Sequence, residues 1–186
     1  MSSAANLSPN ELFAPPRGVR CRELLRLDEF ESTQHIVQFY EDESLVIENI
    51  SYLAAKAMAA GNSTVLVATE THLELINEQL ARFGLNLDAL RESGRYVTLN
   101  AAEALSQIVV DSKPDKAKFA DVIGGIVASA AKNSANDFVF VFGEMVALLC
   151  AADNADAAVR LERLWNSLAE QHRFSLYCAY FPEQPW

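Results

Sequence analysis

Short, continuous apolar runs alternate with longer segments of helical periodicity along most of this 186-residue chain. The clearest runs are residues 64–68 and 138–142, where apolar side chains, most of them β-branched or aromatic, occupy consecutive positions. Such runs are typical of parallel strands that are covered on both faces, because a strand with one exposed face alternates apolar and polar residues. The pattern therefore predicts an α/β fold with a mostly parallel sheet.

The same alternation predicts a central sheet of about five strands with helices on both faces, a three-layer sandwich. The expected strands are residues 35–40, 64–68, 96–99, 138–142 and 174–180. Between them, helices are expected to begin at caps formed by Asp42, Asn100 and Asp115, and at a capping box that starts at Thr71. The helix that follows Asn100 is expected to run to about Val110.

Domain organisation and location follow from composition. Residues 34–186 are expected to form one globular domain, and residues 1–33, which contain Pro15-Pro16 and Gly18, a flexible or docking segment. No signal peptide or membrane-spanning run is expected, and three cysteines without metal-ligand spacing predict reduced thiols in the cytoplasm. The net charge of −10 argues against nucleic-acid and anionic-membrane partners.

The first strand-to-helix turn excludes a working P-loop NTPase. Such a loop uses glycine amides and a lysine to hold phosphates, whereas this turn offers Glu41, Asp42 and Glu43. Likewise, the strand at 138–142 resembles a Walker B strand in which Gly143 replaces the usual aspartate. These two features predict that no nucleotide is hydrolysed.

Ligands of open parallel sheets bind at the carboxyl ends of the strands, where Tyr40, Thr69, His72 and Glu144 are expected. Glu144 there suits a base, a metal ligand or a hydrogen-bond acceptor, and equally a first-turn glutamate of the next helix. His72 suits a ligand contact or an exposed first-turn position. His35, at the start of a strand, is expected to be structural on its position alone.

Cys178 and Trp165 are expected to fill the core, although the polar atom of the indole could line a pocket. Neither a Ser-His-Asp nor a Cys-His catalytic arrangement is indicated. The chain is therefore not expected to be an enzyme, and no cofactor or metal is expected.

Several stretches together resemble one family, the MEDS domain (methanogen/methylotroph, DcmR-type sensory domain). The resemblance covers about residues 35–181, and its most specific parts are the Phe-Gly-Glu-Met-Val run at 142–146 and the Ser-Leu-Tyr-Cys-Ala-Tyr run at 175–180. It implies a RecA/KaiC-like sandwich without ATPase loops, and a role in sensing small molecules, including hydrocarbon derivatives, in bacterial and archaeal signalling.

Such domains are often joined to a histidine kinase or a DNA-binding domain. Neither is expected here, so the domain is expected to act through a signalling partner of one of those kinds or by forming a homo-oligomer. A degenerate NTPase-like scaffold, which binds nucleotide or protein without hydrolysis, remains the alternative, and a hydrolase using Glu144 and His72 has no specific motif. The resemblance carries over nine candidate ligand-binding residues: His35, Tyr40, Glu41, Thr69, His72, Glu144, Trp165, Asn166 and Tyr180.

Overall fold

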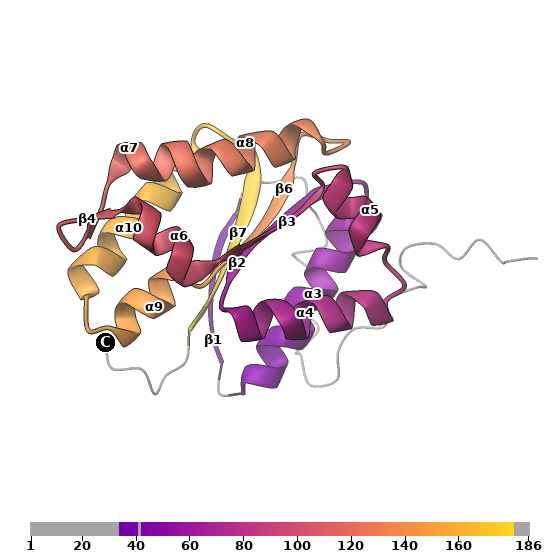
Figure 1. The fold of residues 1–186 in the computed structure, drawn as a ribbon, viewed down its shortest axis with the longest axis horizontal. Helices are drawn as coiled ribbons and strands as arrows, with labels where there is room; N and C mark the ends of the chain where they lie inside the picture. Colours follow the sequence, from indigo (N-terminus) through magenta and orange to yellow (C-terminus); the bar gives the residue numbers. More distant parts are fainter. Residues whose placement is uncertain (1–33, 41, 181–186) are drawn as a thin grey trace, which may run out of the picture.

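The computed structural model describes residues 34–40 and 42–180, and these residues form a five-stranded sheet between two layers of helices (Figure 1). All neighbouring strands of this sheet are parallel, and their spatial order is β1-β7-β6-β2-β3. The strands are β1 (His35–Phe39), β2 (Ser63–Ala68), β3 (Tyr96–Asn100), β6 (Val139–Gly143) and β7 (Phe174–Tyr180). The predicted three-layer α/β fold is thus confirmed.

One face of the sheet is covered by α3 (Glu43–Ala59) and α4 (Glu70–Arg82), with α5 (Leu87–Glu92) beside β3. Helix α3 is buried along most of its length, from Val46 to Met58. It begins at Asp42, whose carboxylate accepts a hydrogen bond from the Ser44 amide at 2.8 Å. The Ser44 hydroxyl, and then the Ser44 amide, lower the pKa of Asp42, because their hydrogen bonds favour the charged carboxylate.

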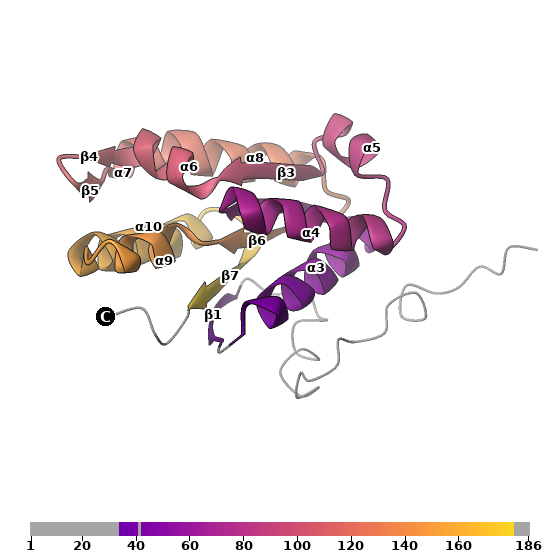
Figure 2. The ribbon, with the colours of Figure 1, turned by 60° about the horizontal axis from the view of Figure 1, so that its bottom comes forward.

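The opposite face is covered by the helices between β3 and β7 (Figure 2). They are α6 (Ala101–Ile108), α7 (Lys116–Phe119), the π-helical turn η1 (Ala120–Gly124), α8 (Gly125–Lys132), α9 (Met145–Ala151) and α10 (Ala155–Ala169). Between α6 and α7, β4 (Val109–Val110) and β5 (Lys113–Pro114) form a small antiparallel pair. The sequence did not predict this pair.

Alternation along the strands divides the core into two clusters. In β2, Val65 and Val67 pack with α6 to α10, whereas Leu66 and Ala68 pack with α3 and α4. Successive side chains of a strand point to opposite faces, so a strand buried on both faces needs apolar residues at every position. The continuous run at 64–68 is thereby explained.

Two local predictions are wrong. Helix α4 begins after Thr69 rather than after Thr71, and Thr69 makes no side-chain cap. Helix α6 ends at Ile108, two residues earlier than expected, because Val109 and Val110 pair with β5. The caps at Asn100 and Asp115 are confirmed: Asn100 accepts from two amides and Asp115 from the Lys118 amide.

Within residues 34–40 and 42–180, no helix is both long enough and apolar enough to cross a membrane. The docking segment predicted for residues 1–33 lies outside the described residues. The RecA/KaiC-like affiliation stays a prediction.

Candidate functional site

A buried carboxylate occupies the place where a ligand is expected in a sheet of this kind. The chain leaves β2 toward β3 and leaves β6 toward β7, so the strand order reverses between the neighbours β2 and β6. Glu144 follows β6 directly and is 5% exposed. Its Oε2 accepts a hydrogen bond of 2.7 Å from the Thr69 amide, at the end of β2, and its own amide donates to Val67. The Glu144 side chain thus bridges the two carboxyl ends.

His72, in the first turn of α4, completes this bridge. Its Nδ1 contacts the Glu144 carboxylate, and its Nε2 lies 2.5 Å from Oε1 of Glu43, at the start of α3. The pKa of His72 is raised to about 9, mainly by the hydrogen bond to Glu144, against the opposing effect of burial. His72 is therefore a cation at neutral pH, held between a buried carboxylate and an exposed one.

The His72 charge makes stability depend on pH. The folded-state pKa of about 9 lies above the ordinary 6.5, so the stabilisation is complete below about pH 6.5 and is lost as pH rises through about 9. We expect the free energy of unfolding in urea to fall by on the order of 2–3 kcal/mol over this window, since one pKa unit is about 1.4 kcal/mol. His72→Gln should flatten the curve, and an unchanged slope in this variant would contradict the assignment.

A second polar group lies on the α3 face of the sheet. The Tyr40 hydroxyl contacts the Tyr177 hydroxyl, which donates to Gln38, and Asn49 of α3 donates to Tyr40 at 3.1 Å. Tyr40 and Tyr177 are 4% and 0% exposed. These hydrogen bonds satisfy polar atoms inside an apolar cluster, so the Tyr40 hydroxyl is engaged within the protein.

A third group lies on the other face, between β1, β7 and α10. His35 Nδ1 is 2.9 Å from Asn166 Oδ1, and His35 Nε2 is 3.2 Å from Glu162 Oε2. Cys178 Sγ lies 3.7 Å from the same Nε2. The Tyr180 hydroxyl donates to Glu162 Oε1 at 2.5 Å, and burial keeps the pKa of this phenol raised, so it remains a donor. These contacts join five residues from three elements, His35 of β1, Glu162 and Asn166 of α10, and Cys178 and Tyr180 of β7.

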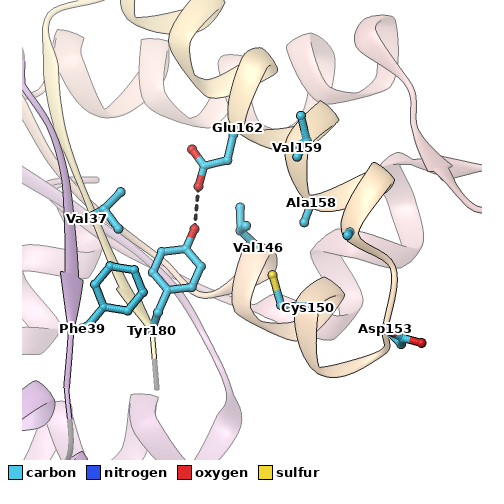
Figure 3. Close-up of a pocket in the computed structure, with 10 residues that line it drawn as sticks. Val37, Phe39, Val146, Cys150, Asp153, Ala158, Val159, Glu162 and Tyr180 are labelled. Carbon is cyan, nitrogen blue, oxygen red and sulfur yellow. Dashed lines mark hydrogen bonds between the residues drawn. The ribbon is translucent and has the colours of Figure 1, made fainter. Parts of the chain in front are cut away.

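A mostly apolar pocket of about 270 Å³ adjoins this third group. Figure 3 shows Val37 and Phe39 of β1 on one side and side chains of α9 and α10 on the other, with the Tyr180–Glu162 hydrogen bond between them. Its lining residues are Val37, Phe39, Val146, Cys150, Asp153, Ala155, Ala158, Val159, Glu162 and Tyr180. Val37, Phe39 and Val159 are each about half exposed, so large apolar side chains meet solvent here.

The nine candidate residues therefore separate. Thr69, His72 and Glu144 belong to the bridge between β2 and β6, which is the first polar group. Tyr40 belongs to the second group, and His35, Asn166 and Tyr180 belong to the third. Trp165 is 1% exposed and packs edge-on against Phe119 and Phe174, with ring centroids 5.1 Å and 6.1 Å away. Glu41 lies outside the described residues.

Sequence reasoning missed Glu162 as the centre of the third group. One signal was available: Glu162 and Asn166 are four residues apart and so share a helix face. The spacing of His35, Val37 and Phe39 likewise places them on one face of β1. The sequence does not show that β1 pairs with β7, and this pairing brings the β1 face with His35 next to the α10 face with Glu162.

The sequence model described as "MEthanogen/methylotroph, DcmR Sensory domain" (MEDS) matches residues 34–184. No curated protein and no solved structure matches the chain. The match includes all five strands of the sheet and the three polar groups described above. The chain belongs to the MEDS family of sensory domains.

Proposed function

We propose that this protein is a non-catalytic sensor of a small, mostly apolar molecule, which binds in the pocket between β1, β7, α9 and α10. The observation that carries the proposal is the pocket itself: a concave, largely apolar site with a few polar groups at one side is what small-molecule sites share. Its volume of about 270 Å³ suits a compact ligand, such as a hydrocarbon derivative.

Exposure supports the same location. The side chains of Val37, Phe39 and Val159 are 47%, 56% and 52% exposed. Large apolar side chains gathered at one place on a surface usually mark a binding site. The Tyr180–Glu162 pair supplies a hydroxyl and a carboxylate to orient a polar substituent of the ligand.

The chemistry of the nearby thiols favours binding over catalysis. Burial raises the pKa of Cys178 well above its usual range, and it also raises that of Cys150 in the pocket. A nucleophilic cysteine needs a lowered pKa. His72, the other candidate for acid–base chemistry, has both ring nitrogens engaged by carboxylates.

The output is proposed to be a change in the affinity for a signalling partner, of the histidine kinase or transcription regulator type, or for a second copy. A nucleotide-binding scaffold has less support. The Glu144 carboxylate lies between the carboxyl ends of β2 and β6, and the Glu43 carboxylate contacts His72 of the same group, so a polyphosphate would meet carboxylates there.

Native mass spectrometry of the purified full chain, followed by calorimetric titration, tests the site. Any retained molecule is titrated into the unaltered protein and into Val159→Glu. If none is retained, a panel of short-chain alcohols and chlorinated hydrocarbons is used. We expect at least about a tenfold loss of affinity, or 1.4 kcal/mol, because a carboxylate at the mouth opposes apolar binding.

Val110→Glu is the matched control, since Val110 is an exposed apolar residue that does not line the pocket. It should bind as the unaltered protein does. Equal affinities of the two variants for the same molecule would show that binding occurs elsewhere.

A further inference from the structure

Three chemically different metal ligands converge beside the pocket. His35 Nε2, a carboxylate oxygen of Glu162 and Cys178 Sγ all lie within 4.8 Å of one another. They come from β1, α10 and β7, elements that the fold brings together from distant parts of the chain. Imidazole, carboxylate and thiolate are the groups that bind Zn²⁺ in proteins.

The distances between these atoms suit a tetrahedral ion. Tetrahedral Zn²⁺ bound to nitrogen at about 2.0 Å, oxygen at about 2.1 Å and sulfur at about 2.3 Å separates N from O by about 3.3 Å and N from S by about 3.5 Å. The structure places Nε2 3.2 Å from Glu162 Oε2 and 3.7 Å from Cys178 Sγ. Two of the three edges of the site are therefore already formed.

The surrounding residues orient these ligands as a metal site requires. Asn166 Oδ1 lies 2.9 Å from His35 Nδ1 and accepts its proton, which leaves the lone pair of the neutral ring on Nε2. Tyr180 donates to Glu162 Oε1, which directs the other oxygen, Oε2, toward that lone pair. Two electron-rich atoms then face each other at 3.2 Å, an arrangement that a cation between them stabilises.

A proton on Nε2 would satisfy this contact as well, and would make His35 an imidazolium paired with Glu162. In that alternative the Cys178 sulfur, 3.7 Å from the same nitrogen, is only a weak hydrogen-bond partner of His35. The two possibilities differ in whether the thiol binds a metal.

We propose that His35, Glu162 and Cys178 form a site for a divalent transition-metal ion, with Zn²⁺ the best fit. Binding would release the thiol proton to solvent and form a metal–thiolate bond, while His35 and Glu162 bind through Nε2 and Oε2. The side chains of His35 and Glu162 are 20% and 25% exposed, which gives the ion a path from solvent. Three protein ligands leave one coordination position open.

Titration of the metal-free, reduced full chain with Co²⁺ tests the proposal, because Co²⁺ adopts the geometry of Zn²⁺ and absorbs visible light. We expect a thiolate-to-Co²⁺ charge-transfer band in the near ultraviolet, and its loss when Zn²⁺ is added, since Zn²⁺ binds more tightly. Cys178→Ser should abolish the band. Asn166→Ala, which leaves all three ligands in place, should weaken binding by about 10- to 100-fold.

Glu162→Gln, which removes the charge of one ligand, should also weaken Co²⁺ binding. Its matched control is Glu170→Gln, at the exposed end of α10, and Cys150→Ser and Cys21→Ser are the matched controls for the thiol. These controls should keep the band, and circular dichroism should show that every variant is folded. The proposal is overturned if the unaltered protein gives no charge-transfer band, or if Cys178→Ser keeps it. No pocket ligand is used, so the result is independent of the proposed sensing function.

Discussion

Replacing Glu144 by alanine is expected to lower the free energy of unfolding by about 3–5 kcal/mol, the cost of removing one partner from a buried ion pair. The change leaves the Thr69 amide without its acceptor and leaves His72 with only the exposed Glu43. Both losses act at the junction of β2 and β6, in the centre of the sheet. Urea unfolding at pH 7, with linear extrapolation, measures the difference.

Two further variants separate the contributions to this loss. Glu144→Gln keeps an acceptor for the Thr69 amide but loses the charge, so it should be less destabilising than Glu144→Ala. Glu74→Ala, an exposed glutamate in the same helix as His72, should change stability by less than about 0.5 kcal/mol. A Glu144→Ala protein as stable as the Glu74→Ala control would rule out a structural role for the bridge.

Gly143→Asp, which introduces the aspartate of a Walker B strand, is expected to destabilise the fold by at least about 3–5 kcal/mol. A Cβ at Gly143 would lie 3.5 Å from Leu176 Cδ1 and 3.6 Å from Trp165 Cζ2. An aspartate would therefore place its carboxylate against the apolar side chains of Leu176 and Trp165. Thermal or urea unfolding measures the loss.

Gly143→Ala is the control for this substitution. The added methyl group makes ordinary van der Waals contacts. The backbone φ of Gly143 is not positive, so alanine can adopt the same conformation. We expect its stability to stay within about 1 kcal/mol of the unaltered protein. Similar losses of stability in Gly143→Ala and Gly143→Asp would mean that the available space, rather than the charge, makes glycine necessary at this position.

The sheet was predictable from the sequence because its evidence is local. Each central strand is a continuous apolar run, and the caps at Asp42, Asn100 and Asp115 depend on residues two or three positions away. The β4–β5 pair was not predictable, because Asp111 and Ser112 form its turn with positive φ and contain no glycine.

The candidate site was predictable only in part, because its contacts are not local. Thr69, His72 and Glu144 follow from the rule that places ligands at the carboxyl ends of strands, yet their mutual engagement depends on the adjacency of β2 and β6. The third group depends on β1 lying beside β7, which no local pattern encodes. Trp165 illustrates the limit: an aromatic residue on the apolar face of a helix has the same sequence signature in a core as in a pocket.

The alternation along β1 fixes the register of this edge strand from both sides. Val37 and Phe39 meet the pocket while Gln38 is bound to Tyr177 on the opposite face. A slip by one residue would turn Gln38 toward the pocket and an apolar side chain toward the tyrosine hydroxyls, and both exchanges are unfavourable. The first strand is therefore held in a single register against its neighbour β7.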